Sequence, residues 1–355
     1  MSKFFSAKYA KLVPYVPGEQ PKDAQYVKLN TNESPFPPPQ SVVEAAKAEA
    51  TKLQLYSDPE SAVLTQKTAE VLGVQPSQVL MTNGSDEALN FAFMAFCDEN
   101  HPIVFPDISY GFYSVFAKLN AIPYKTIPLK DDFSVDYRDY LGVKANVVIA
   151  NPNAPTGLAL SRSEVEEILK SNPDNVVIID EAYVDFGGES CVPLIDKYEN
   201  LLVTQTFSKS RSLAGARLGM AIGNEKLIAD LNTIKYSTNP YNVNRMTAAA
   251  GYAALCETDW FESSVNTIRS NREDTKARLR ELGFTVLDSK TNFLFVKSDK
   301  VSGEELYKTL KARGVLVRHF SGERIKDYVR ITIGTAEQMQ ILLEKTEEII
   351  KGEKV

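Results

Sequence analysis

Short apolar runs alternate with stretches of helical spacing through most of the chain. The runs predict seven β-strands, at 79–82, 103–106, 124–128, 146–150, 176–180, 201–206 and 217–223. Helical spacing is found at 42–53, 61–72, 86–96 and 162–169. Most of the runs are followed by Gly, Pro, Asn or Asp and then by a helical stretch. This order predicts βα units and a mainly parallel sheet.

The pattern changes after the turn-rich segment STNPYNVN at 237–244. One long helical stretch is expected from there to about 281–283. The remainder predicts a smaller unit with strands at 285–287, 293–296, 315–318 and 329–333 and helices at 303–313 and 336–351. The expected fold is therefore α/β, with a large domain built on a mainly parallel seven-stranded sheet between helices and a smaller α+β domain.

We expect three parts along the chain. Residues 1–29 are predicted to form an N-terminal arm and part of the small domain, 30–244 the large domain, and 245–355 the small C-terminal domain. A length of 355 residues is enough for this organisation.

Composition narrows the classes of function. A net charge of −6 gives no basic field, so neither nucleic acid nor an anionic membrane is expected as a main partner. Three scattered cysteines and two histidines predict neither a disulfide framework nor a metal site. The chain has no run of roughly 18 apolar residues and starts without a secretory leader, so we expect a cytoplasmic protein.

Polar and turn-forming residues follow four of the predicted strands, at 82–87, 151–157, 180–183 and 208–217. In an open parallel sheet, ligands bind outside the carboxyl ends of the strands. These four segments are therefore expected to meet at one edge. The first of them, with Gly84, Ser85 and Asp86, opens a helix whose backbone N–H groups could hold a phosphate, although an ordinary Ser or Asp helix cap is the favoured explanation for this segment alone.

Asp180 ends the apolar run VVII. An ionised carboxylate is costly there unless a cation meets it, and a protonated ring nitrogen would suit. The alternative is an Asp that caps the following loop. Tyr183 could donate a hydrogen bond to a phenolic oxygen of the same ring or could belong to the core.

Lys209 stands two residues before Arg211 and eight before Arg217. Nearby cations lower the pKa of a lysine, and such an amine can form a Schiff base with a carbonyl group. A surface lysine is the alternative. The guanidinium fork of Arg217 suits a phosphate.

The order of NPNAPTG, DEAY and TFSKSRSLAGARLG resembles the fold-type I pyridoxal-phosphate aminotransferases. The segments KLVPYVPG, KLNTNESPFPP, YSDPES, TNGSDE, ISYGFYSVFA and PYNVN are similar to the histidinol-phosphate aminotransferase branch. The similarity covers essentially the whole chain. It implies that the large domain binds pyridoxal 5'-phosphate. The implied reaction, in histidine biosynthesis, converts L-histidinol phosphate and 2-oxoglutarate into imidazole-acetol phosphate and L-glutamate.

The resemblance also implies a role for individual residues. Lys209 would be the Schiff-base lysine and the proton carrier, Asp180 would pair with the pyridine nitrogen, and Tyr183 would contact the ring hydroxyl. The phosphate would be held by Gly84, Ser85, Asp86, Thr206, Ser208 and Arg217. Tyr110 would stack on the ring, and Tyr56 would reach the phosphate of the neighbouring subunit, which implies a homodimer with shared active sites.

One position departs from the family pattern. Members more often have NPNNPTG, and the second of the adjacent asparagines binds the ring oxygen, whereas this chain has Ala154. Either Asn153 reaches the cofactor instead, or Tyr183 serves the ring oxygen together with water.

Substrate recognition is expected from Arg318 and Arg330, on two predicted strands of the smaller unit. In the family these positions bind the phosphate of histidinol phosphate and a carboxylate of glutamate or 2-oxoglutarate, while surface ion pairs are the alternative. Tyr15 and Asn32 match positions that line the substrate pocket.

Other functions stay open at this point. An aromatic-amino-acid transaminase or a phosphothreonine decarboxylase would keep the cofactor and change the substrate. A ligand-binding homologue without turnover is disfavoured by the presence of Lys209, Asp180 and Arg217. A nicotinamide-dependent oxidoreductase would need a GxGxxG motif after an early strand, which the sequence lacks.

Overall fold

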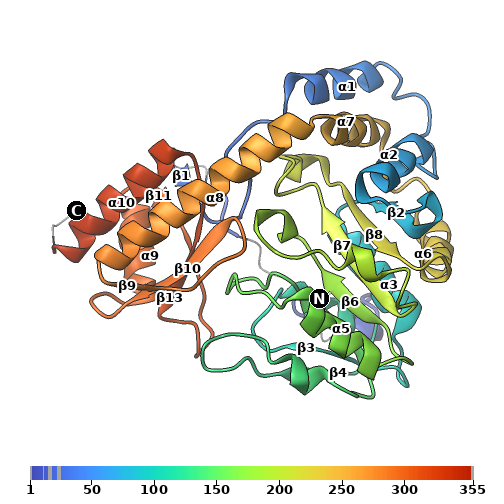
Figure 1. The fold of residues 1–355 in the computed structure, drawn as a ribbon, viewed down its shortest axis with the longest axis horizontal. Helices are drawn as coiled ribbons and strands as arrows, with labels where there is room; N and C mark the ends of the chain where they lie inside the picture. The colour runs from blue at the N-terminus through green and yellow to red at the C-terminus, as the bar shows by residue number, and fades with distance from the viewer. Residues whose placement is uncertain (1, 11, 15–17, 22–24, 353–355) are drawn as a thin grey trace.

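The chain folds into a large and a small unit that are connected by one long helix, α8 (Thr258–Glu281) (Figure 1). The computed structural model describes residues 2–10, 12–14, 18–21 and 25–352. Among these residues, no helix is both long and apolar enough to cross a membrane.

The large unit is built on a seven-stranded sheet, and six of its strands run in the same direction. Its strands are β2 (Val79–Thr82), β3 (Ile103–Pro106), β4 (Tyr124–Ile127), β5 (Asn146–Ala150), β6 (Val177–Asp180), β7 (Leu201–Thr206) and β8 (Gly219–Gly223). They lie in the order β2-β8-β7-β6-β5-β3-β4, with β8 antiparallel to both neighbours. The prediction of a mainly parallel seven-stranded sheet is confirmed. Strand β8 begins later than predicted because Arg217 has a left-handed backbone, with φ of 55°.

Helices cover both faces of this sheet. Along β5, Val147 and Ile149 face one core and Val148 and Ala150 face the other, as the twofold period of a strand requires. The first core is closed by α1 (Gln40–Ala50), α2 (Ala62–Leu72), α5 (Arg162–Ser171) and α7 (Arg245–Cys256). The second is closed by α3 (Ser85–Phe96), α4 (Phe112–Leu119) and α6 (Glu225–Thr238). The sequence pattern did not predict α4 or α6.

The small unit contains a four-stranded antiparallel sheet in the order β12-β13-β10-β9. These strands are β9 (Phe284–Val286), β10 (Phe293–Ser298), β12 (Arg318–His319) and β13 (Tyr328–Thr332). Helices α9 (Gly303–Ala312) and α10 (Ala336–Ile350) pack on it together with α8. A separate parallel pair joins β1 (Val27–Lys28) to β11 (Val315–Leu316), so the single strand predicted at 315–318 is split at Val317.

The long helical stretch predicted after Asn244 is wrong in one respect, because the structure has two helices there. Helix α7 ends at Cys256, and Glu257, with φ of −91° and ψ of 60°, interrupts the helical backbone before α8. The two helices serve different cores: Ala254 of α7 packs with the large sheet, whereas Ile268 of α8 packs with the small unit. The division at 244–245 stays a prediction, and we propose Glu257 as an alternative boundary.

Six 3-10 helices complete the described chain: η1 (Ala7–Tyr9), η2 (Pro76–Gln78), η3 (Tyr137–Tyr140), η4 (Val184–Phe186), η5 (Val192–Leu194) and η6 (Ala214–Ala216). Of these, η4 follows β6 after a three-residue turn, and its N-cap is Tyr183.

Candidate active site

The polar strand exits meet in one cavity, as the topology predicts for parallel strands. It is lined by Ser85, Asp86, Tyr110, Ala150, Ala154, Asp180, Ala182, Tyr183, Thr206, Ser208, Lys209 and Arg217. Most of the residues proposed from the sequence to contact a cofactor are therefore neighbours in space.

Asp180 lies at the end of β6 and is 4% exposed. The Tyr113 hydroxyl donates to its Oδ2 at 2.8 Å, and the Thr204 hydroxyl donates to its Oδ1 at 3.1 Å. Burial raises the pKa of Asp180 to about 6, although these two hydrogen bonds act in the opposite direction. Among the described residues no cation forms an ion pair with Asp180, so a ligand that carries a positive N–H group fits this position.

Backbone and side-chain donors surround the start of α3. Gly84 has φ of 79°, and Ser85 is the first helical residue. Strand β8 passes so close that a Cβ on Gly219 would lie 2.3 Å from the Ser85 nitrogen. Arg217 Nη2 reaches Asp86 Oδ2 at 3.1 Å. Free N–H groups at a helix start together with a guanidinium suit a phosphate group.

Two further hydroxyls stand at the exit of β7. The Thr206 hydroxyl donates to Ser208 Oγ at 3.0 Å, and the Ser208 backbone N–H donates to Thr206 Oγ1 at 3.1 Å. Both residues line the same cavity as Arg217. Because the Thr206 proton is used in this way, the Ser208 hydroxyl can donate its own proton to a group in the cavity.

Lys209 faces Tyr183, with its Nζ 5.8 Å from the centre of the Tyr183 ring. The Tyr183 hydroxyl accepts a hydrogen bond from Asn32 Nδ2 at 2.9 Å, and the ring packs edge-on against Phe293. Asn32 thereby holds the hydroxyl of Tyr183, and Phe293 holds its ring. Arg211, which the sequence places beside Lys209, lines a different cavity.

The side chains of Asn153 and Ala154 have different surroundings, although the residues are adjacent in the sequence. Asn153 is 1% exposed, and its amide donates to the Ile108 carbonyl and to Thr156, while its oxygen accepts from Ser109. Ala154 lines the cavity and Asn153 does not. The contact suggested for Asn153 therefore has no support from this geometry, and Tyr183 stays the group nearest that role.

A second cavity, of about 230 Å³, adjoins the first. The two share Tyr110, Ala154, Tyr183 and Lys209. Arg318 and Arg330 both line the second cavity, and they lie directly opposite each other across β12 and β13. Arg330 Nη2 also donates to the Asn30 carbonyl at 3.0 Å. Two guanidinium groups thus face a space next to Lys209.

The other residues proposed from the sequence are Asn32, Tyr56 and Tyr15. Asn32 is buried and lines the second cavity. Tyr56 lies outside both cavities: it is 78% exposed and stacks on Tyr241 with ring centres 4.5 Å apart. Tyr15 lies outside the described residues.

Tyr113 and Thr204 are site residues that the sequence reasoning missed. Tyr113 lies three residues after Tyr110, in the first turn of α4, and is fully buried. Thr204 is the register partner of Asp180 in the neighbouring strand. The sequence could have indicated Thr204. Once the ends of two neighbouring parallel strands are placed, the residues paired across them are known to lie side by side.

Comparison with known proteins decides the family. The family model described as "Aminotransferase class I and II" matches residues 24–345. The chain belongs to this family. Two relatives of the aminotransferase, both curated as histidinol-phosphate aminotransferase, come from Brachyspira hyodysenteriae and Clostridium acetobutylicum. The first is 50% identical over 354 residues (99% of this chain and 100% of the relative) and the second 46% over 351 residues (99% and 100%). The resemblance inferred from the motifs is confirmed.

Solved structures agree on the fold of the aminotransferase. The histidinol-phosphate aminotransferase from Sinorhizobium meliloti, in complex with pyridoxal-5'-phosphate, has a TM-score of 0.90 at 23% identity and covers 99% of both chains. The L-threonine-O-3-phosphate decarboxylase from Porphyromonas gingivalis has a TM-score of 0.80 at 23% identity, with 91% of this chain and 99% of that chain covered. The fold is therefore confirmed, and it is shared by proteins with different reactions.

Proposed function

We propose that this aminotransferase uses pyridoxal 5'-phosphate to convert L-histidinol phosphate and 2-oxoglutarate into imidazole-acetol phosphate and L-glutamate, a step of histidine biosynthesis. The names of relatives that match it over nearly its full length support this reaction. The structural observation that carries it is the pair Arg318 and Arg330, which face one cavity beside Lys209. A substrate with an amine and a phosphate can place its amine at Lys209 and its phosphate at the two arginines.

The cavity fits the cofactor. Asp180 offers a buried carboxylate for a protonated ring nitrogen, and the start of α3 with Arg217 offers donors for a phosphate. When bound, pyridoxal phosphate supplies a carbonyl carbon for the amine of the substrate and a ring that accepts electron density from its Cα.

The protein side chains then have separate tasks. Lys209 Nζ would take the proton from the substrate Cα as a general base and would return it as a general acid. Tyr183, held by Asn32 and Phe293, orients the ring oxygen. Asp180, held by Tyr113 and Thr204, keeps the proton on the ring nitrogen.

Substrate recognition falls to the small unit. Arg318 and Arg330 would bind the phosphate of histidinol phosphate by charge-assisted hydrogen bonds, and a carboxylate of glutamate or 2-oxoglutarate in the second half of the reaction. Both anions need the same guanidinium geometry, so one pair of arginines can serve both halves.

The homodimer and the cytoplasmic location belong to this proposal. Exposed apolar side chains near Tyr56, with Leu53 at 62% and Leu55 at 56%, support a surface that another subunit covers. Light scattering of the purified protein would show the dimer mass. A monomer at assay concentration would contradict the shared active site.

The test is a stopped-flow spectrum of the cofactor-loaded protein mixed separately with L-histidinol phosphate, L-phenylalanine and O-phospho-L-threonine, without any oxo acid. We expect rapid loss of the visible cofactor band with histidinol phosphate alone and its return with 2-oxoglutarate. Faster loss with phenylalanine would indicate an aromatic transaminase, and carbon dioxide release from phosphothreonine a decarboxylase. A protein without a cofactor band would contradict the role of Lys209.

A further inference from the structure

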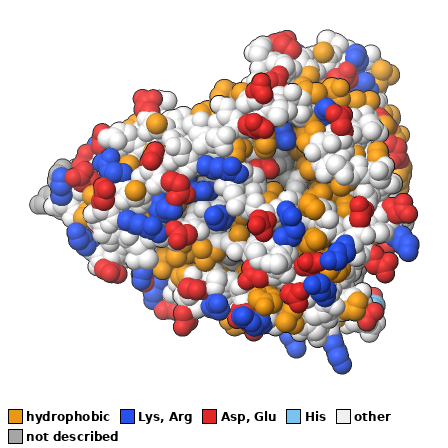
Figure 2. Space-filling model, viewed as in Figure 1, with side chains coloured by type: hydrophobic (Ala, Val, Ile, Leu, Met, Phe, Trp, Pro, Cys, Tyr) orange, Lys and Arg blue, Asp and Glu red, His pale blue; other side chains and the backbone are white. Residues whose placement is uncertain are grey.

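A third cavity, of about 580 Å³, lies between the large sheet, α2, η4 and the start of α8. The surface in Figure 2 is hollowed beside α8, where Figure 1 shows the helix passing the large unit. Thr206 lines both this cavity and the candidate active site. Its volume is in the range of about 300–1,000 Å³ that small-molecule sites occupy.

Two arginines line this cavity, and the charge of Asp185 acts on one of them, Arg211. Arg211 packs on the Phe261 ring, 4.2 Å from its centre, and Nη1 donates to the Ala254 carbonyl at 2.9 Å. Arg269 Nη2 donates to the Asp185 carbonyl at 2.6 Å, while its buried Nε has no hydrogen-bond partner. In the described part of the chain, neither guanidinium forms an ion pair. An anion placed in this cavity would face two guanidinium groups.

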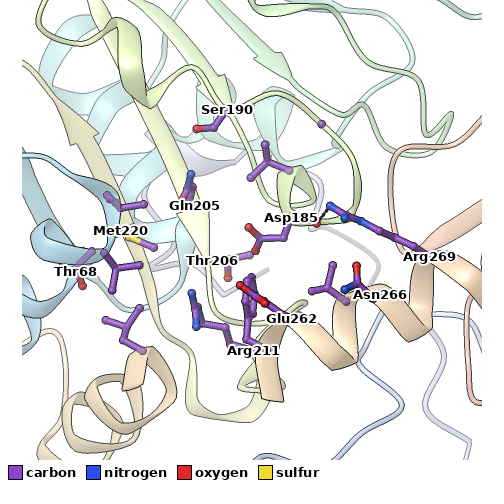
Figure 3. A pocket seen from close by; sticks show the side chains of 17 residues that line it. Thr68, Asp185, Ser190, Gln205, Thr206, Arg211, Met220, Glu262, Asn266 and Arg269 are labelled. Atoms are coloured by element: carbon purple, nitrogen blue, oxygen red, sulfur yellow. Dashed lines mark hydrogen bonds between the residues drawn. The ribbon is translucent and has the colours of Figure 1, made fainter. Parts of the chain in front are cut away.

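Two carboxylates line the same cavity. In the view of Figure 3, Asp185 and Glu262 lie between Arg211 and Arg269. Asp185 accepts from the Ser210 hydroxyl, and neither acid has an ion-pair partner among the residues that the structure describes. The charges of the cavity are thus balanced, two positive and two negative. A ligand with a single charge would be attracted by one pair and repelled by the other.

The remaining wall is apolar, with Val71, Leu72, Met220 and Leu255. We propose that this cavity binds a free α-amino acid with an apolar side chain. Its carboxylate would lie against Arg211 and Arg269, its ammonium group near Asp185 and Glu262, and its side chain on the apolar wall. This inference does not rest on the proposed reaction.

The test is isothermal titration calorimetry of the cofactor-loaded protein with 1-aminocyclopentane-1-carboxylate. This compound has a carboxylate, an ammonium group and an apolar ring, and it has no hydrogen on Cα that the candidate active site could remove. We expect saturable binding with one site per chain. Arg269→Met, which removes the guanidinium, should weaken binding at least about tenfold, as the loss of a charge-assisted hydrogen bond requires.

Two further variants test whether the compound binds in this cavity. Val71 is 45% exposed, so Val71→Trp should fold and should weaken binding by filling the cavity. Arg278→Met changes an exposed arginine of the same helix outside the cavity and should leave binding unchanged. Absence of saturable heat at millimolar compound would overturn the proposal. Heat that survives both Arg269→Met and Val71→Trp would place the compound elsewhere and would overturn it as well.

Discussion

The Tyr113 hydroxyl donates a 2.8 Å hydrogen bond to Asp180 Oδ2, and both side chains are buried. A hydrogen bond to the charged form of a carboxylate lowers its pKa. Tyr113 therefore opposes the rise in pKa that burial imposes on Asp180, and it keeps the carboxylate ionised beside the proposed ring nitrogen.

Tyr113→Phe is expected to raise the pKa of Asp180, because it removes a hydrogen bond that lowers this pKa. The acid limb of the pH profile of kcat/KM should move to higher pH, with about a tenfold loss at neutral pH and a smaller loss in alkaline solution. Tyr140→Phe is the control, because Tyr140 is equally buried and lies in another core. A uniform loss at every pH would show that Tyr113 acts only through packing.

Asp180→Ala should reduce kcat far more than Tyr183→Phe. The first removes the charge partner of the ring nitrogen, with an expected loss of about 100-fold or more, whereas the second removes one hydrogen-bonding group, with a loss of about tenfold. Steady-state rates of the two variants, each saturated with cofactor, check the order. Equal rates would contradict the assigned roles.

Stability should fall as the pH rises through the range in which Glu181 titrates. Burial raises its pKa to about 7 from 4.5. Between these pH values the folded protein keeps a proton on Glu181 that the unfolded chain has lost, so the free energy of unfolding decreases with pH and levels off above about 7. One such group changes the free energy of unfolding by at most about 1.4 kcal/mol per pH unit.

Urea unfolding of the cofactor-free protein across this pH window measures the effect. Glu181→Gln should flatten the dependence, although Asp180, whose pKa burial raises to about 6 from 3.8, still contributes in the lower part. Glu199→Gln, at an exposed acid, should leave the slope unchanged. A slope that Glu181→Gln does not reduce would show that Glu181 is ionised in the folded protein.

Arg318→Gln should raise KM for histidinol phosphate about 10- to 100-fold with a smaller change in kcat, because one of two guanidinium groups facing the phosphate is lost. Arg318→Lys should recover only part of the loss, since an ammonium group cannot form the paired hydrogen bonds. Lys308→Gln, at an exposed lysine of α9, is the control. An unchanged KM would assign the phosphate to other residues.

Gly219→Ala should weaken cofactor binding, because the added Cβ would lie 2.3 Å from the Ser85 nitrogen and would displace the start of α3. Gly215→Ala is a matched control, since a Cβ there meets no atom within 4 Å. Titration of the cofactor-free proteins with pyridoxal phosphate gives both affinities. Equal affinities would show that the helix start does not hold the phosphate.

The sequence predicted those parts of the fold and site that depend on neighbouring residues. The run VVII places Asp180 at a strand exit, and the cavity there contains Lys209 and Arg217 as well. Tyr113 was missed because its contact with Asp180 spans 67 positions and depends on how α4 packs. The choice between Asn153 and Ala154 also lay beyond the sequence, because the turn geometry decides which side chain faces the cavity.

Asn32 connects parts of the molecule that lie far apart in the sequence. Its amide donates to Tyr183 at η4, its side-chain oxygen accepts from the Thr332 hydroxyl, and its carbonyl accepts from Asn292 at 3.0 Å. Two of these partners belong to the small unit and one to the large unit. Asn32 therefore connects the small unit, through Thr332 and Asn292, to the tyrosine whose ring faces Lys209, so the position of this ring depends on how the two units pack together.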